Sequence, residues 1–182
     1  MERRAQSVKF ILYVLICMLC IISNVTALVF QLLFYELPCP LCLMQRYGFL
    51  AVGYGCVLSI KENSKVEHNI IIIISIIYTM VVAIRQMLLH IAPHDLGYGS
   101  TFLGIHFYTW SALISISFIT LMALLPVLEN SINTFFLKKS YLSRLPSLML
   151  KSILILTIIN VISMYLECGF TMCPANPIRY MH

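Results

Sequence analysis

The sequence predicts an all-α, polytopic membrane protein: a four-helix transmembrane bundle with a fifth transmembrane helix packed alongside. Hydrophobic residues make up 60% of the 182 residues and charged residues only 10%, whereas a soluble domain has about 25% charged residues. The apolar residues also gather into five long stretches, each near the roughly 20 residues that a membrane helix needs. Lipid is therefore expected to surround most of the chain.

The five predicted spans belong to one integral membrane domain, residues 1–182. They cover residues 10–33, 39–60, 70–89, 107–128 and 148–166. Backbone N–H and C=O groups in lipid find no water, so these stretches are expected to be helices. The first follows basic residues as in a signal peptide, but it is longer than a secretory core and lacks a small-residue cleavage site. We expect it to be a retained first span.

The basic residues predict the orientation of the spans, since lysine and arginine concentrate on the cytoplasmic side. Only Arg46, Arg85 and Arg179 fall on the other side when five spans alternate. The remaining basic residues share one side: Arg3, Arg4, Lys9, Lys61, Lys65, Lys138, Lys139, Arg144 and Lys151. The N-terminus is thus expected in the cytoplasm and the C-terminus on the outer side. The net charge of +5 reflects this topology, and no nucleic-acid partner is expected.

A C-x-x-C motif begins the second span. Cys39 and Cys42 flank Pro40 and Leu41, and proline suits the first turn of a helix. The positive end of the helix dipole stabilises a thiolate there, and Arg46 follows Cys42 by one helical turn. The pattern favours a redox-active dithiol at the outer face. A plain structural disulfide is the alternative, and zinc is a weaker one because no second ligand pair lies nearby.

Two further cysteine pairs differ in their expected surroundings. Cys168 and Cys173 follow the fifth span, so the topology places them on the same side as the C-x-x-C motif, as disulfide exchange requires. A static disulfide that holds the tail is the alternative. Cys17 and Cys20 also have C-x-x-C spacing, but they lie inside the first span. A desolvated thiolate is unfavourable there, so we expect these two to pack between helices.

Arginine inside a span is unfavourable and marks a functional site by default. Arg46 is expected to act with Cys42. For Arg85, function and snorkelling of the side chain to the headgroups both stay open. Histidines surround the outer segment of residues 90–106, and imidazole could carry the proton that accompanies electrons leaving a thiolate. His90, five residues after Arg85, is the best candidate.

The segment Cys39-Pro40-Leu41-Cys42-Leu43-Met44-Gln45-Arg46 resembles the C-x-x-C-x-x-x-R signature of the bacterial disulfide bond formation protein B family. Arg85 through His90 is similar to the end of that family's third span, and Leu103-Gly104 followed by Trp110 to the start of its fourth. The resemblance covers residues 8–128. It implies an inner-membrane enzyme that reoxidises a periplasmic thioredoxin-like dithiol oxidase. The electrons would pass to ubiquinone or menaquinone, held near Arg46, Arg85 and His90.

Two departures from the family's pattern matter. The family's second cysteine pair lies between spans three and four, where residues 90–106 hold no cysteine here, and members typically have four spans. We infer that the fifth span delivers Cys168 and Cys173 as the replacement pair. Two other functions stay open: a transmembrane reductant conductor using Cys17 and Cys20, and a non-enzymatic metal-binding transporter subunit using Cys168, Cys173 and His182. The interpretation as a quinone-linked thiol oxidoreductase needs no metal.

Overall fold

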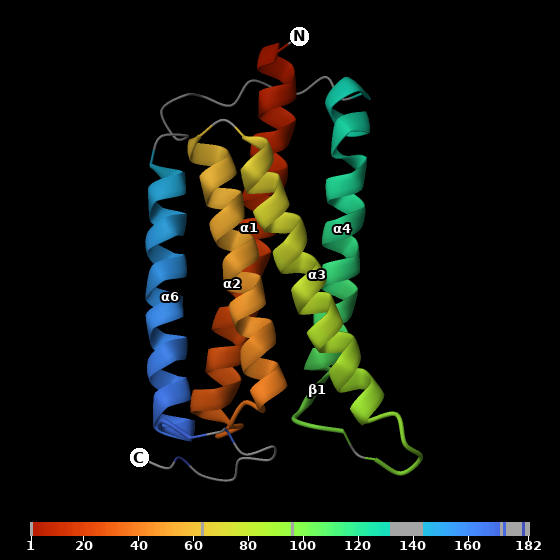
Figure 1. Ribbon diagram of the computed structural model, residues 1–182, viewed down its shortest axis with the longest axis vertical. Coiled ribbons are helices and arrows are strands. Elements are labelled where there is room, and N and C mark those ends of the chain that lie inside the picture. Colours follow the sequence, from red (N-terminus) through yellow and green to blue (C-terminus); the bar gives the residue numbers. More distant parts are fainter. Residues whose placement is uncertain are drawn as a thin grey trace.

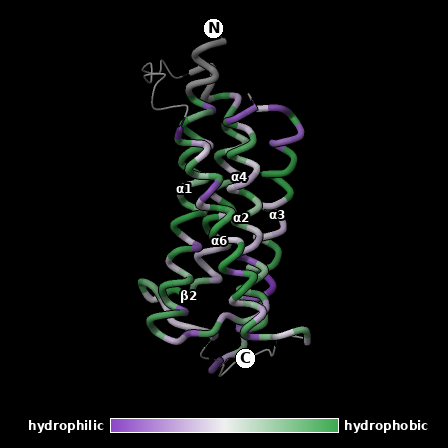
Figure 2. The backbone as a smooth tube through the Cα atoms, turned by 90° about the vertical axis from the view of Figure 1, so that its left-hand side faces the viewer, coloured by the Kyte–Doolittle hydropathy of each residue, from purple (hydrophilic) through white to green (hydrophobic). Residues whose placement is uncertain are grey.

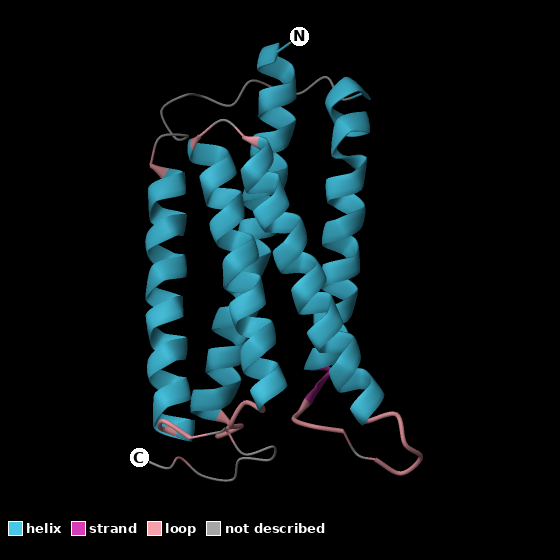
Figure 3. Cartoon of the chain, in the orientation of Figure 1, coloured by secondary structure: helices cyan, strands magenta, loops and turns pink. Residues whose placement is uncertain are grey.

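The structure is an elongated bundle whose helices run along one axis (Figure 1). This computed structural model describes residues 2–62, 64–95, 97–131, 144–171, 173 and 180; within these, the side chains of residues 2–7 and 128–131 are not described. The helices are α1 (Glu2–Leu33), α2 (Pro40–Lys61), α3 (Val66–Leu89), α4 (Phe107–Ser131) and α6 (Leu145–Cys168). Two short strands, β1 (Thr101–Phe102) and β2 (Ile105–His106), pair antiparallel before α4, so nearly all of the regular structure is helical (Figure 3).

Within the described residues, five helices are long and apolar enough to cross a membrane, which confirms the predicted all-α class. The qualifying segments are Val8–Leu33, Pro40–Lys61, Val66–Leu89, Phe107–Val127 and Leu145–Cys168. Figure 2 shows hydrophobic residues along most of the length of these helices. The chain is therefore a multi-pass membrane protein. The ends of these segments differ from the predicted ones by at most four residues, although helix α1 itself begins earlier, at Glu2.

The helices form a bundle of four with a fifth at its side. α2 packs against α1 and α3, and α4 packs against α3 and α1. α6 lies against α2 and α1, at the opposite side of the bundle from α4 (Figure 1). Each helix contributes to one buried core, for example through Ile16, Val52, Ile72, Phe118 and Ile153.

Glycines bring α2 and α3 close together. A Cβ atom at Gly55 would lie 2.8 Å from Cγ1 of Ile72, and one at Gly48 would overlap the side chain of Thr79. Both partners are on α3. Small residues let the backbones of membrane helices approach closely, where packing rather than the hydrophobic effect holds them. The α2–α3 pair is thus a tight support for the C-x-x-C motif at the start of α2.

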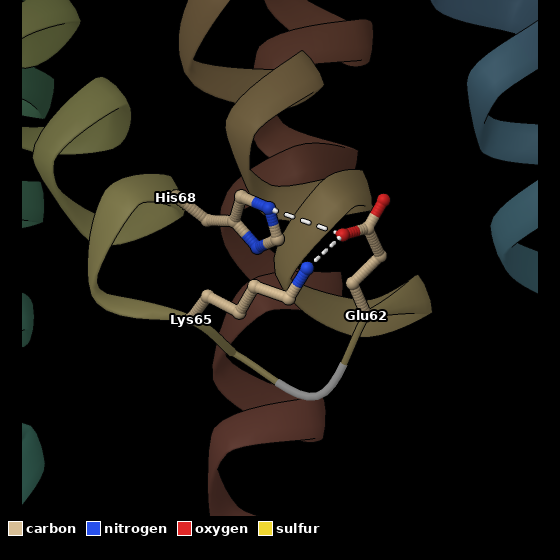
Figure 4. Close-up of polar contacts among 3 residues, drawn as sticks. All are labelled: Glu62, Lys65 and His68. Atoms are coloured by element: carbon tan, nitrogen blue, oxygen red, sulfur yellow. Dashed lines mark hydrogen bonds and ion pairs between the residues drawn. The ribbon is translucent and has the colours of Figure 1, made fainter.

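The turn between α2 and α3 closes the end of the bundle that lies far from that motif. Nζ of Lys65 lies 2.7 Å from Oε2 of Glu62, and Nε2 of His68 lies 3.7 Å from the same oxygen (Figure 4). The hydrogen bond from Lys65 lowers the pKa of the Glu62 carboxyl. The hydroxyl of Tyr13 contacts Ser64 and Asn69 over 2.9 and 2.7 Å. These contacts tie α1 to the turn.

Because successive helices alternate in direction, the other end of the bundle includes the three helix ends that matter for the site. The start of α2, the end of α3 and the end of α6 all lie there (Figure 1). That end therefore holds both the C-x-x-C motif and Cys168.

Candidate active site

The C-x-x-C motif is built into the N-terminus of α2. Cys39 is the N-cap residue, and its Sγ accepts a hydrogen bond of 3.1 Å from the backbone N–H of Cys42. Pro40 occupies the first helical position, where its missing N–H is not needed. The two cysteines form a disulfide with their Cα atoms 5.0 Å apart. When this bond is reduced, the unpaired N–H groups of the first turn face the sulfur atoms and stabilise a thiolate.

A glutamine pair from two helices supports the disulfide. Nε2 of Gln86 on α3 donates to Sγ of Cys39 over 3.2 Å and to Sγ of Cys42 over 3.3 Å. Nε2 of Gln45 donates to Oε1 of Gln86 over 2.7 Å and so orients that amide. Both glutamines are buried. The sequence analysis did not select either glutamine as a site residue, although a polar amide inside an apolar span indicates a side chain that faces the protein interior.

Arg46 lies one turn further into α2 and is almost completely buried, at 9% exposure. Its Nη1 donates to Oε1 of Gln31 over 2.6 Å, and its Nη2 donates to the carbonyl oxygen of Ala27 over 3.2 Å. The amide nitrogen of Gln31 in turn contacts the hydroxyls of Ser163 and Tyr180. Arg46 therefore does not snorkel to the headgroups. Residues of α1, α6 and the tail hold it inside the protein.

A cavity of about 280 Å³ contains both Cys42 and Arg46 in its lining. Its walls come from α1, α2, the start of α4 and the outer segments, and aromatic rings form much of them: Phe30, Phe49, Phe102, Phe107, Tyr108 and Trp110. Asn24 adds a buried Oδ1 that has no hydrogen-bond partner among the described residues. Pockets for organic cofactors are typically apolar with a few placed polar groups, and this cavity has that character.

The outer segment between α3 and α4 covers one side of the cavity. The hydroxyl of Tyr98 donates to the carbonyl oxygen of Leu37 over 2.6 Å, and Glu36 accepts hydrogen bonds from the backbone N–H and the hydroxyl of Ser100. Burial, and then the nearby carboxyl groups of Glu167 and Glu36, raise the pKa of Tyr98 to about 12. Tyr98 therefore stays a neutral hydrogen-bond donor at physiological pH.

His90 contacts the cavity only through a neighbouring ring. It caps the end of α3, and its Nδ1 lies 3.1 Å from Oδ2 of Asp95. Its ring stacks on Tyr108, which also stacks on His106 with centroids 5.7 and 5.1 Å apart. Neither histidine lines the cavity, whereas Tyr108 does. The structure thus brings His90 and His106 together around one wall of the cavity.

Arg85 and His94 lie outside this arrangement. Both are exposed, and neither lines the cavity. Gln86, the next residue after Arg85, points into the bundle instead, because successive helical side chains project about 100° apart. The role expected for Arg85 stays a prediction, and so does proton transfer by His94, one of the histidines of the outer segment.

The second cysteine pair lies at the same end of the bundle. Cys168 is the last residue of α6 and is buried, and it forms a disulfide with the half-buried Cys173. The helix ends because Gly169 adopts a φ of 59°, a conformation that favours glycine. The thiols of Cys17 and Cys20, by contrast, are free and buried in the core. Within the described residues no group of three His, Cys, Asp or Glu side chains is placed to hold a metal ion; His182 lies outside them.

One comparison with known proteins identifies this arrangement. The family model described as disulfide bond formation protein DsbB matches residues 9–98. The chain belongs to the DsbB family. It is thus a membrane protein of disulfide bond formation, with the oxidoreductase chemistry which that family name implies. The match spans α1 to α3 and includes the C-x-x-C motif and Arg46, whereas α4, α6 and the Cys168–Cys173 pair of this DsbB-family protein lie beyond it. No curated protein and no solved structure matched the chain.

Proposed function

We propose that this protein is a quinone-dependent oxidoreductase that reoxidises a periplasmic thioredoxin-like dithiol carrier. The observation that supports it best is the cavity shared by Cys42 and Arg46. A redox-active sulfur and a buried cation inside an aromatic-walled space are what electron transfer to an apolar acceptor requires. Membership of the DsbB family supports the same chemistry.

The residues of the cavity fit a quinone ring. Its aromatic walls would stack on a flat apolar ring, and Arg46 carries N–H donors that could bind a ring oxygen. The unpaired Oδ1 of Asn24 offers an acceptor for a protonated oxygen. A quinone bound there would accept two electrons and two protons. The chain itself would position the sulfur, supply the positive charge and exclude water.

The Cys168–Cys173 disulfide would receive the electrons first. A thiolate of the reduced carrier attacks the more accessible Cys173 sulfur, the S–S bond breaks, and Cys168 leaves as a thiolate. The second carrier thiol loses its proton and attacks the carrier sulfur of the mixed disulfide, which releases Cys173. The carrier leaves oxidised, and Cys168 and Cys173 are left as a dithiol.

The same exchange would then pass the electrons to the C-x-x-C motif. Cys168 and Cys173 return to a disulfide, while the Cys39–Cys42 bond breaks. Cys42 stays a thiolate because three groups stabilise its charge: the N-terminus of α2, the amide of Gln86 and the guanidinium of Arg46. His90 supports the Tyr108 wall of the cavity. For Arg85 we propose at most an indirect role.

The orientation proposed from the basic residues agrees with this scheme. The N-terminus would be cytoplasmic, and both disulfides would face the periplasm of a bacterial inner membrane. Cys39 caps the start of α2 and Cys168 ends α6, and these two helix ends lie at the same end of the bundle (Figure 1), so a single periplasmic carrier could serve both pairs without crossing the lipid.

Anaerobic mixing of the purified protein, a reduced thioredoxin-like oxidase and a soluble quinone tests the function. We expect quinol to form in step with oxidation of the carrier. Cys42→Ser should abolish quinol formation, whereas Cys56→Ser, at a buried free cysteine in the core, is the matched control and should retain it. Carrier oxidation without quinol formation would show that the electrons go to another acceptor.

A further inference from the structure

The face of α6 that packs into the bundle becomes polar toward the active-site end. Its buried residues recur at alternating intervals of four and three, the spacing of a heptad seam: Met149, Ile153, Leu156, Asn160, Ser163 and Glu167. The first three are apolar and the last three polar. Ser163 contacts Gln31, which accepts from Arg46. The last turns of α6 therefore complete the polar surroundings of Arg46.

Glu167 is the residue of this seam that the mechanism above does not use. Its side chain is fully buried, at 0% exposure. Neither carboxyl oxygen has a hydrogen-bond partner among the described residues. Burying an ionised carboxylate without hydrogen bonds is strongly unfavourable, so these surroundings favour the neutral acid. A helix contact that served packing alone would not need a carboxyl group.

Among the described residues, the charged group that acts on Glu167 is Arg46. The two interact electrostatically, yet Arg46 donates its described hydrogen bonds to Gln31 and Ala27 rather than to the carboxyl group. A charge on Glu167 would nevertheless act strongly on Arg46, because the low dielectric of a buried site weakens screening. Ionised Glu167 would offset the positive charge that the Cys42 thiolate needs.

Among the described residues, the other titratable groups around this pair are tyrosines and, when the second disulfide is reduced, the thiol of Cys168 next to Glu167. Tyr47 on α2 and Tyr180 in the tail interact with Arg46, and Tyr98 in the outer segment interacts with Glu167. The facing residue of α1, Gln31, carries no charge. Glu36 acts on Tyr98. Since tyrosines stay neutral near pH 7, Glu167 is, among the residues that the structure describes, the carboxyl group whose titration changes the net charge beside Arg46.

We propose that Glu167 is a proton-binding residue that, when protonated, leaves the positive charge of Arg46 available to the Cys42 thiolate. This rests on the proposed redox role of Cys42. In the exchange step, the Cys168 and Cys173 thiols give two electrons to the Cys39–Cys42 disulfide. One of their two protons goes to Cys39, and the other leaves to water at the outer face, since Cys42 remains a thiolate. Glu167 keeps its own proton throughout and acts on Cys42 through Arg46 as a positioning residue.

Infrared spectroscopy of the oxidised protein tests the protonation directly. We expect the carbonyl band of a protonated carboxyl group to persist at neutral pH, where exposed carboxylates are ionised. The band should be lost in Glu167→Gln, which keeps the size of the side chain. It should remain in Glu67→Gln, a control at an exposed glutamate at the start of α3. A band that is absent from the unaltered protein at neutral pH, or that survives in Glu167→Gln, overturns the proposal.

Alkylation of Cys42 in the reduced protein tests the link to Arg46. The rate follows the thiolate fraction, and we expect its pH profile to show two inflections, one from Cys42 and one from Glu167. Glu167→Gln should leave a single inflection, and Glu167→Asp should restore the second. Identical profiles in the unaltered protein and Glu167→Gln would refute the link. Neither measurement needs carrier or quinone, so failure here is separate from failure of the quinol assay.

Discussion

Nε2 of Gln86 lies 3.3 Å from Sγ of Cys42, although 44 residues separate them in the chain. The same nitrogen also reaches Cys39, so one amide from α3 serves both sulfur atoms of the motif. A hydrogen bond to a thiolate is stronger than one to a disulfide sulfur, because the acceptor is charged. Gln86 therefore stabilises the reduced form of the motif more than the oxidised form.

Replacing this amide should make the motif harder to reduce. We expect Gln86→Leu to lower the reduction potential of the Cys39–Cys42 pair by roughly 30–60 mV, because a hydrogen bond to a charged group contributes roughly 1.5–3 kcal/mol and 30 mV corresponds to about 1.4 kcal/mol. Equilibration with defined thiol–disulfide buffers measures the potential. Thr79→Val, at another buried position of α3, should leave it unchanged. An unaltered potential in Gln86→Leu would mean that the amide serves packing alone.

Arg46 should contribute to use of the quinone more than to folding. Arg46→Ala should raise the quinone concentration required for half-maximal turnover by roughly 10- to 100-fold, since hydrogen bonds to charged groups contribute roughly 1.5–3 kcal/mol. Arg46→Lys should keep partial activity, because the charge remains but the two nitrogens that reach Gln31 and Ala27 do not. Steady-state kinetics at matched protein abundance measures both. Unchanged quinone dependence in Arg46→Ala would refute the assignment.

The two cysteines of the second pair should behave differently when changed singly. Cys173 is more accessible than the buried Cys168, so the carrier should meet Cys173 first. In Cys168→Ser the lone Cys173 thiolate should attack the disulfide of the oxidised carrier and release one carrier thiolate, which leaves a mixed disulfide visible as a reducible band on a non-reducing gel. Cys173→Ser should trap much less.

Turnover of the carrier should collapse in both variants if the pair is a relay. A static disulfide predicts instead lower thermal stability, near-normal turnover and no trapped complex. If the double variant oxidises the carrier at the unaltered rate, Cys39 and Cys42 meet the carrier directly.

The outer segment should loosen in acid through Asp95. The N–H of Gly97, and secondly His90, lower the pKa of this carboxyl. A depressed pKa in the folded state contributes stability above the unfolded value of about 3.9, and this contribution is lost as the pH falls through the folded pKa. The fluorescence of Trp110, the chain's single tryptophan, should report the change, because its Nε1 donates to Phe102 in the same segment. Asp95→Asn should remove the acid-dependent step; if the step persists, another group causes it.

The proposed orientation has a direct test. A reporter that fluoresces only in the cytoplasm should stay dark when fused after His182, because five spans from a cytoplasmic N-terminus end outside. The same reporter fused within the turn between α2 and α3, after Lys65, is the control and should fluoresce. A bright C-terminal fusion would reverse the orientation assigned to both disulfides.

The helices were predictable because lipid imposes a simple requirement. Each span needs about 20 apolar residues, whichever neighbours it packs against. The sequence also predicted that Cys42 and Cys168 lie at the same end of the bundle, because the alternation of the spans determines which helix ends lie on each side of the membrane. The sequence further placed Arg46 beside Cys42 through the helical repeat. These inferences depend on the order of the spans along the sequence and not on how each helix is rotated about its own axis.

The partners of these residues depend on that rotation and were not predictable. A polar residue in a span indicates that its side chain faces the interior, but it does not say what it meets there. Arg85 and Gln86 are neighbours, and sequence reasoning chose the first as the functional candidate. Packing of α3 against α2 turned the second toward the sulfur atoms. The close approach at Gly55, which fixes that packing, is visible only once the two helices are paired.

The amide of Gln31 joins three helices and the tail, and this has a consequence for biosynthesis. Its oxygen accepts from Arg46, and its nitrogen contacts Ser163 and Tyr180. Helices enter the membrane in the order of translation, so α1 and α2 are inserted long before α6 leaves the ribosome. Until then the buried guanidinium has only part of its final surroundings. The last helix to be made completes the polar environment of an arginine made at the beginning, so a chain that stops early lacks a finished active site.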